Sequence, residues 1–384
     1  MSLGDFKKLN ILNVAWVGQG DFGDEAMAFA LRRFFKKNGV NSITYYQHGK
    51  YPHYRSQDDS KITYLHKFEG RGWRRYLFDN ILLKKFNALI IGGGSVLHSH
   101  ENIRWKYEIL KKIKKNNRQI FSANVGVSLG PFKSERDLDI CGEYLDEVDI
   151  SIFRDNWSAD LAKKISKNKN IFSSLDSTLI LPEICKDEMQ RAKNVEREDD
   201  LVGIFFVERC NWSNFSDRIK KYSEIINNIL ARGKKIVLFN FYLGEVFRDA
   251  EVINLLKEKS RFPEKIEIYP FDGDIFKSIK EMARCGKIIS MRLHPIIFSY
   301  MLDIPFLSLE YDQKNKNFCE SIGYPKELVM KFDAEKETSP IIKSLEAFFE
   351  EKHYFENVMP KEEAIQIVSK NFNFLLDEMK KKLS

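Results

Sequence analysis

The chain has 384 residues, of which 43% are hydrophobic and 30% are charged, and its formal net charge is +7. This length suits two α/β domains, and the hydrophobic fraction is ordinary for a globular protein. The mild positive charge favours anionic ligands but gives no reason to expect a nucleic acid as partner.

The cysteines and the apolar segments exclude several further classes. The five cysteines are odd in number, scattered, and never spaced as CxxC. We therefore expect reduced thiols, and neither a disulfide framework nor a metal site. The N-terminus has no apolar signal-peptide core, and no run approaches the roughly 18 apolar residues of a membrane-spanning helix. We therefore expect a cytoplasmic protein, and leave open a position at the inner face of the membrane.

The first predicted unit is a buried strand over residues 11–17, a glycine turn, and a helix that extends to about Lys37. The turn contains a literal GxGxxG pattern formed by Gly18, Gly20 and Gly23. A dinucleotide is nevertheless disfavoured, because carboxylates at Asp21, Asp24 and Glu25 would repel a pyrophosphate. Of these, Asp24 and Glu25 suit a sugar, either as hydrogen-bond acceptors or as a general base. The alternative is that they only favour the helix dipole.

Further glycines and polar residues follow the next strands. A strand over residues 86–91 leads into Gly92, Gly93 and Gly94, whose backbone can approach a ligand closely. Arg154 follows a strand over residues 149–153, where it could bind a carboxylate or phosphate bidentately. The basic, aromatic run at residues 71–76 and the lysine-rich helix at 104–118 are most simply solvated surfaces. Contact with a phosphorylated or lipid-linked acceptor, or with anionic lipid, is the alternative.

The second half repeats the pattern of strands and helices. Polar residues 186–200 indicate a linker between an N-terminal domain at 1–185 and a C-terminal domain at 201–340. Residues 341–384 are predicted to form amphipathic helices, one of which could pack back onto the first domain. The expected architecture is thus α/β, with two Rossmann-like domains facing across a cleft and C-terminal helices.

The most informative stretch is residues 287–314. A buried strand ends near Ser290, a short apolar helix follows, and a second strand covers residues 306–309. Arg292 and His294 lie at the strand-to-helix turn, where a cation, an imidazole and helix N–H groups can bind an anion. Lys314 reaches the same sheet edge, because ligand sites gather at the carboxyl ends of parallel strands. A structural ion pair at Arg292 and a helix cap at His294 are the alternative.

These residues resemble the polysaccharide pyruvyl transferase family. The resemblance covers most of residues 11–325 and rests on Gly23-Asp-Glu-Ala26, the glycine triplet, Arg292-Leu-His294 and Tyr311-Asp-Gln-Lys314. It implies a fold similar to GT-B glycosyltransferases, and transfer of the enolpyruvyl unit of phosphoenolpyruvate onto a sugar as a ketal. Gln313 stands where the family often has proline, which puts the role of Lys314 in doubt. The family often has an arginine after the first strand of the second domain, and the register leaves Arg209 open as its counterpart.

The resemblance also implies roles for individual residues. His294 would be the acid. Arg154, Arg292 and Lys314 would bind phosphoenolpyruvate. Residues on the acceptor side, as ligands or base, would be Asp24, Glu25, Gly92, Gly93, Gly94 and Asp176. We expect no cofactor and no metal; the partners are the donor and a sugar, oligosaccharide or lipid-linked glycan, with membrane contact and homo-oligomerisation left open. Two other classes remain, a nucleotide-sugar glycosyltransferase on the same fold and a non-catalytic glycan-binding protein.

Overall fold

The computed structural model describes residues 9–40, 42–47, 63–66, 81, 83–117, 119–244, 246–333, 337–350 and 354–383. The basic, aromatic run at 71–76 lies outside these residues. The chain divides into two compact units. Unit 1 comprises residues 1–18, 24–184 and 364–384, and unit 2 comprises residues 19–23 and 185–363. No helix among the described residues is long and apolar enough to cross a membrane.

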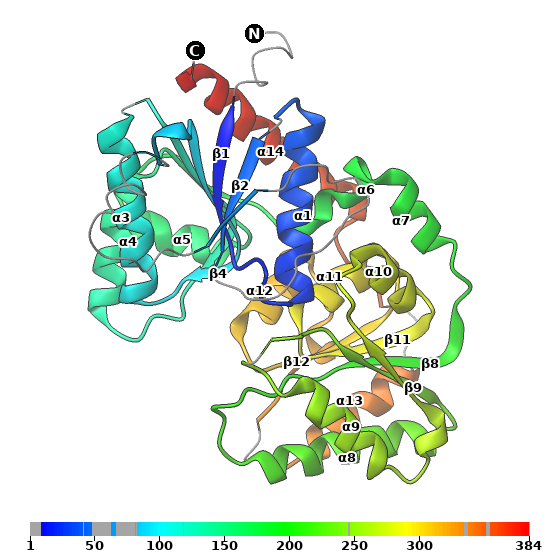
Figure 1. Ribbon diagram of the computed structural model, residues 1–384. Coiled ribbons are helices and arrows are strands. Elements are labelled where there is room, and N and C mark those ends of the chain that lie inside the picture. The colour runs from blue at the N-terminus through cyan, green and yellow to red at the C-terminus, as the bar shows by residue number, and fades with distance from the viewer. Residues whose placement is uncertain are drawn as a thin grey trace. The chain divides into compact units, whose positions relative to one another are not determined.

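Unit 1 is built on a parallel sheet of seven strands in the order β3-β2-β1-β4-β5-β6-β7 (Figure 1). Its strands are β1 (Asn10–Val14), β2 (Ser42–Gln47), β3 (Thr63–His66), β4 (Ala88–Leu97), β5 (Phe121–Leu129), β6 (Ile150–Phe153) and β7 (Ile171–Ser173). The described helices are α1 (Phe22–Lys37), which begins within unit 2, α3 (His100–Asn116), α4 (Glu135–Glu147), α5 (Asn156–Ile165), α6 (Leu181–Ile184) and most of α14 (Lys361–Leu383), with 3-10 turns η3 (Leu83–Lys85) and η4 (Ser177–Ile180). Nearly all residues described in β1, β4, β5 and β6 are buried, as expected for parallel strands that are covered on both faces.

Helices cover both faces of this sheet. α3 and α4 pack side by side over one face, with α5 beside α4 (Figure 1). On α1, the apolar stripe predicted from its helical spacing is buried, and Phe34 meets Phe372 of α14 with ring centroids 4.9 Å apart. α14 also places Phe374 against Phe172 on β7, with 4.9 Å between ring centroids. The apolar stripe of the last helix is therefore part of the core of unit 1.

Two strands run further than their glycines suggest. The glycine triplet lies inside β4 and Gly126 inside β5, with a register irregularity next to each. Gly93, Gly94 and Gly126 have φ values of +76°, +81° and +65°, which side-chain-bearing residues rarely adopt. At these glycines β4 and β5 thus continue as bulged extensions of the strands.

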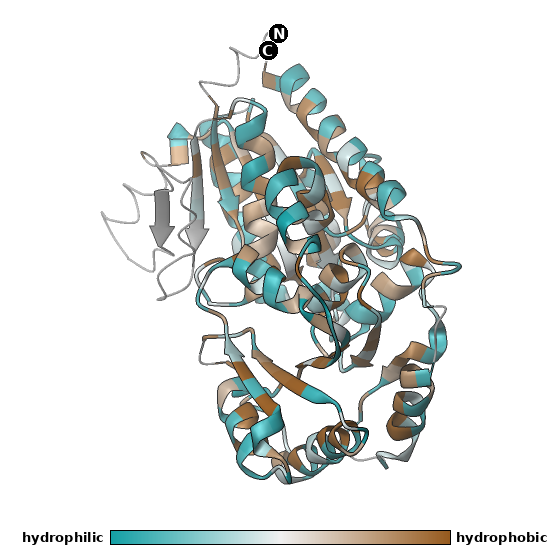
Figure 2. Cartoon of the chain, turned by 90° about the vertical axis from the view of Figure 1, so that its right-hand side faces the viewer, coloured by the Kyte–Doolittle hydropathy of each residue, from teal (hydrophilic) through white to brown (hydrophobic). Residues whose placement is uncertain are grey.

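Unit 2 contains a parallel sheet of six strands in the order β10-β9-β8-β11-β12-β13. Its strands are β8 (Glu198–Phe205), β9 (Lys235–Asn240), β10 (Ile266–Pro270), β11 (Cys285–Ser290), β12 (Phe306–Glu310) and β13 (Val329–Lys331). The described helices are α7 (Lys186–Lys193), α8 (Phe215–Ala231), α9 (Asp249–Glu258), α10 (Ile275–Ala283), α11 (Leu293–Met301), α12 (Gln313–Ile322) and α13 (Ser339–Glu350), with 3-10 turns η5 (Pro263–Lys265) and η6 (Lys326–Leu328). α8, α9 and α13 lie on one face, and α10, α11 and α12 on the other (Figure 1). Hydrophobic segments follow the strands, and the helices alternate between hydrophobic and hydrophilic residues (Figure 2).

Residues 186–200, expected from their polar composition to form a linker, contain helix α7 and the first residues of β8. The reason is that Met189 and Ala192, three positions apart, bury one side of a short helix that packs on α10.

In both sheets the strand order reverses beside a central strand, between β1 and β4 in unit 1 and between β8 and β11 in unit 2. Open parallel sheets bind ligands outside the carboxyl ends of the strands at such reversals. These two edges are therefore the places to look for a functional site.

Candidate active site

The reversal point of unit 2 carries Arg292 and His294. β11 ends at Ser290, whose hydroxyl accepts the backbone N–H of Arg292 at 2.9 Å and donates to the Arg292 carbonyl at 2.7 Å. Arg292 is the N-cap residue of α11, and His294 is the second residue of that helix. Ser290 thus closes a tight turn that holds both side chains at the carboxyl edge of the sheet.

Two carboxylates hold the Arg292 guanidinium. Its Nε donates to Asp249 Oδ2 at 3.2 Å, its Nη2 donates to the same oxygen, and its Nη1 donates to Asp21 Oδ2 at 3.0 Å. Burial opposes the charge on Arg292, but the two carboxylates outweigh it and raise its pKa. Burial raises the pKa of Asp249, while the Arg292 guanidinium acts against that rise. Arg292 is therefore a fully charged group in an ion-paired cluster, as the structural alternative anticipated.

His294 lies against a glycine. A Cβ placed on Gly23 would come within 1.8 Å of His294 Nδ1, so the backbone at residue 23 fits directly against the imidazole. Any larger residue at this position would displace the ring. The last glycine of the GxGxxG pattern is thus explained by close approach to a histidine, with no nucleotide phosphate involved.

Residues 19–23 are bound to unit 2 by backbone and side chain, and we call them the strap. Asp21 and Tyr242 form an antiparallel bridge, Phe22 N donates to Phe241 O at 3.1 Å, and Leu243 N donates to Gly20 O at 3.0 Å. The Phe22 ring packs on the rings of Phe241, Phe271 and Phe298, at centroid distances of 4.2, 5.5 and 5.4 Å. The strap therefore holds Asp21 and Gly23 rigidly beside Arg292 and His294.

A second arginine follows β8, the strand next to β11. The guanidinium of Arg209 lies 5.9, 5.5 and 5.6 Å from the ring centroids of Trp212, Phe247 and Tyr311. Cations are attracted to aromatic faces, so this cage stabilises the charge of Arg209 without a carboxylate. The Nζ atom of Lys314 lies 5.3 Å from the ring centroid of Tyr311, which is one of the three rings of this cage. The sequence left the role of Arg209 open, because the residue that follows the first strand of the second domain could not be fixed from the sequence. The structure shows that Arg209 follows β8, one of the two strands at the reversal point of unit 2.

Unit 1 gathers Arg154 and Asp176 at its own carboxyl edge. Arg154 Nε donates to Ser128 Oγ at 2.6 Å, and its Nη1 donates to Asp176 Oδ2 at 3.2 Å. Asp176 Oδ1 accepts the N–H of Thr178 at 3.0 Å and its hydroxyl at 2.8 Å. Both side chains of the ion pair are buried, so this pair builds the edge rather than presenting a charge to solvent.

The two acidic residues at the start of α1 have different environments. Glu25 is buried and its Oε1 accepts the N–H of Gly18 at 2.7 Å, which fixes the glycine turn. Asp24 is half-buried and lies across from the glycine triplet, because a Cβ on Gly94 would come within 2.7 Å of Asp24 Oδ1. Asp24 is thus the better placed of the two to meet a ligand at the edge of unit 1.

This contact yields a prediction. On the acceptor-side role that the sequence predicts for Asp24, Gly94→Ala should push its carboxylate aside, so the acceptor KM should rise about tenfold while the donor KM stays unchanged. Gly233→Ala is a matched control, since Gly233 also has positive φ, +79° against +81°, but nothing lies within 4 Å of its Cβ position. Both variants should lose about 1–2 kcal/mol of stability from backbone strain. An equal acceptor KM for the two variants would contradict the role of Asp24.

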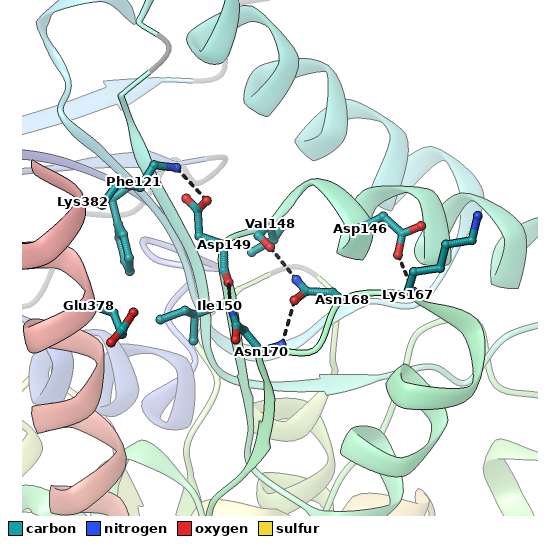
Figure 3. Close-up of a pocket in the computed structure, with 10 residues that line it drawn as sticks. All are labelled: Phe121, Asp146, Val148, Asp149, Ile150, Lys167, Asn168, Asn170, Glu378 and Lys382. Atoms are coloured by element: carbon teal, nitrogen blue, oxygen red, sulfur yellow. Dashed lines mark hydrogen bonds and ion pairs between the residues drawn. The ribbon is translucent and has the colours of Figure 1, made fainter.

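A hollow of about 530 Å³ in unit 1 lies at the opposite ends of the strands (Figure 3). It is lined by the first residues of β5 and β6 and by the last turns of α14. Lys382 donates to Asp149 Oδ1 at 2.6 Å, and Asn170 Nδ2 donates to the Asp149 carbonyl at 3.1 Å. These polar groups bind one another across the junction of α14 with the sheet. We therefore assign this hollow a structural role.

Among the residues that the structure describes, no group of three or more histidine, cysteine or acidic side chains is arranged to hold a metal ion. The predicted site residues fall into two sets. Unit 2 brings together Arg292, His294 and Lys314, and unit 1 brings together Asp24, Glu25, Gly92, Gly93, Gly94, Arg154 and Asp176.

A family model for polysaccharide pyruvyl transferases matches residues 21–313, which include both sets apart from Lys314. The chain belongs to the polysaccharide pyruvyl transferase family. The match begins at Asp21 in the strap and ends one residue before Lys314. Membership in this family makes the chain a transferase.

Solved structures similar to this pyruvyl transferase family member show the same fold. A UDP-N-acetylglucosamine 2-epimerase from Rickettsia bellii matches with a TM-score of 0.62 and 13% identity, covering 97% of each chain. A glycosyltransferase from Rickettsia africae matches with a TM-score of 0.56 and 13% identity, covering 99% of this chain and 100% of the other. At such low identity these likenesses establish the fold alone, which is the expected α/β fold with two Rossmann-like domains, of the kind found in GT-B glycosyltransferases.

Proposed function

We propose that the protein transfers the enolpyruvyl group of phosphoenolpyruvate to a sugar of a cell-surface polysaccharide or its precursor, forming a pyruvate ketal and releasing phosphate. The observation that carries the proposal is the pair Arg292 and His294 at the reversal point of unit 2, in a chain that belongs to this family. An arginine and an imidazole at a helix N-terminus suit a substrate with two anionic groups.

The donor side of the proposal rests on unit 2. Phosphoenolpyruvate carries a phosphate and a carboxylate, and each needs a cation or N–H groups in a water-poor site. Arg209 supplies a cation that aromatic rings hold, and Lys314 lies beside the same Tyr311 ring. Arg292 supplies the third cation, next to His294.

The chemistry follows from the enol phosphate of the donor. A proton delivered to the methylene carbon turns it into a methyl group and leaves positive charge on the carbon that bears the phosphate oxygen. A sugar hydroxyl adds to that carbon and loses its proton, and the C–O bond to phosphate then breaks. A second hydroxyl of the sugar adds and loses its proton, which closes the ketal. We assign the delivery of the first proton to His294, as general acid.

On the acceptor side, Asp24 is assigned to the sugar hydroxyls, as hydrogen-bond acceptor or base. Glu25 is engaged with the Gly18 amide, so its proposed role is to shape the turn that carries Asp24. Arg154 is engaged with Asp176 and Ser128, and we propose that it holds the glycine-rich edge instead of contacting the donor.

The test is incubation with phosphoenolpyruvate and a panel of nucleotide-linked and lipid-linked sugars, following inorganic phosphate and product mass together. Release of phosphate with a mass gain of one pyruvate less one water supports the proposal. Binding of a nucleotide sugar with no binding of phosphoenolpyruvate would point to a glycosyltransferase. Binding of glycan alone, with no turnover of either donor, would point to a non-catalytic glycan-binding protein.

A further inference from the structure

The ion-paired cluster at Arg292 raises a question about anion binding. One guanidinium is held between two carboxylates, Asp249 and Asp21, so the formal charge of the three groups together is negative. A phosphate or carboxylate approaching this cluster would meet more negative than positive charge, in a place where burial strengthens the repulsion. Arg292 therefore becomes an anion ligand only when one carboxylate withdraws.

The two carboxylates differ in how firmly they are held. The Asp249 side chain is 1% exposed, and its Oδ1 accepts the N–H of Glu208 at 3.0 Å. The Asp21 side chain is 18% exposed, and it meets Arg292 through Nη1 alone, whereas Asp249 accepts from both Nε and Nη2. Removing Asp249 from the guanidinium would leave a buried charge uncompensated, and exposing Asp21 to water costs far less. Asp21 is the carboxylate that can yield.

The strap allows this exchange without moving its backbone. Phe22 and the backbone bonds to Phe241 and Leu243 anchor the strap on both sides of Asp21. The other oxygen of Asp21, Oδ1, accepts the N–H of Gly23 at 2.9 Å at the start of α1. Displacement of the Asp21 side chain, with the backbone of the strap in place, would free the Nη1 edge of Arg292.

We propose that Asp21 is a place-holder in the donor site: its carboxylate occupies the Nη1 edge of Arg292 in the free enzyme, and an anionic group of phosphoenolpyruvate displaces it. Asp249 stays in place and fixes the direction of the guanidinium, as a positioning residue. The inference rests on the proposed function for the identity of the donor. It adds a residue on the strap that competes with the donor for one N–H edge.

The two carboxylates on one guanidinium should then respond to substitution with opposite signs. Asp21→Asn keeps an oxygen for the Gly23 amide but removes the competing charge, so the dissociation constant of phosphoenolpyruvate should fall about tenfold, in line with one charged hydrogen bond. Asp249→Asn loosens Arg292, so that constant should rise at least tenfold. Asp21→Ser, which keeps a helix-capping oxygen but is too short to reach Arg292, should behave like Asp21→Asn.

The measurement is isothermal titration calorimetry of the full chain with phosphoenolpyruvate, and separately with inorganic phosphate, after a melting curve for each variant. Glu251→Gln is the control, because that carboxylate lies in the same first turn of α9 as Asp249, its side chain is 60% exposed, and its Oε2 lies 4.0 Å from Arg248 Nε. It should leave the affinity unchanged.

The outcomes separate the two proposals. If wild type binds phosphoenolpyruvate and both Asp21 variants bind it equally or more weakly, Asp21 supports Arg292 and the place-holder is refuted, while the proposed function stands. If wild type and all variants fail to bind phosphoenolpyruvate, both the place-holder and the proposed function are refuted. Tighter binding in both Asp21 variants, with weaker binding in Asp249→Asn, supports the exchange.

Discussion

His294→Gln is expected to lower the turnover number about 10²–10⁴-fold at saturating phosphoenolpyruvate, because a general acid contributes on that scale. Glutamine keeps a polar side chain near Gly23 but has no proton to give at the pH of the reaction. The donor KM should change little, since the cations remain. Phosphate release measured across pH should also lose the limb that reports the acid in the wild type.

His100→Gln is the matched control. His100 begins α3 in unit 1, and its Nδ1 lies 3.7 Å from the exposed carboxylate of Glu101. Its substitution should leave turnover within about a factor of two of wild type, because His100 lies on α3, away from Arg292 and His294 in sequence and in a different unit. If His294→Gln turned over at a near-normal rate with saturating donor, the methylene carbon would receive its proton from another group, and our assignment would be wrong.

Arg154→Met is expected to lower the free energy of unfolding by about 3–5 kcal/mol, because it leaves the Asp176 carboxylate buried without its partner. The side chains of Arg154 and Asp176 are 5% and 2% exposed, so water cannot replace the lost interaction. The double variant Arg154→Met, Asp176→Asn should recover much of the loss, since it removes both charges and keeps an oxygen for the Thr178 donors. Chemical denaturation followed by fluorescence measures all three free energies.

Arg104→Met provides the comparison on the surface of the same unit. The Arg104 and Glu108 side chains form an ion pair in α3, but they are 61% and 43% exposed. Its loss should cost less than about 1 kcal/mol. If Arg154→Met lowered the free energy of unfolding by a similarly small amount, the buried ion pair would contribute no more to stability than the packing of an apolar side chain.

Patterns confined to one segment were sufficient to predict much of the fold. The apolar runs of β1, β11 and β12 and the segment of α1 after the glycine turn carry local signals, and each led to the right element. The short edge strands β7 and β13 have three residues each, too few for a periodic pattern, and were not predicted. The bulges at Gly94 and Gly126 were not foreseen either, because only pairing with a neighbouring strand carries β4 and β5 past their glycines.

The candidate site divides in the same way. Arg292 and His294 are only two positions apart in the sequence, and the sequence alone placed both at a strand-to-helix turn. The ion-pair partners of Arg292 are Asp21 and Asp249, which are far from it in the sequence. No local pattern around either aspartate predicts these ion pairs. Likewise the aromatic cage of Arg209 is assembled from three separate loops. Such contacts follow from topology, which a single sequence does not display.

The strap and α14 have a consequence for how the protein is made. The ribosome finishes all of unit 2 before it releases residues 364–384, which complete the core of unit 1 around Phe34 and Phe172. The Phe22 ring needed by unit 2 is made long before the sheet that receives it. Residues 1–184 therefore lack the helix that completes unit 1, and residues 185–363 lack the strap that completes unit 2, so neither stretch contains a whole unit.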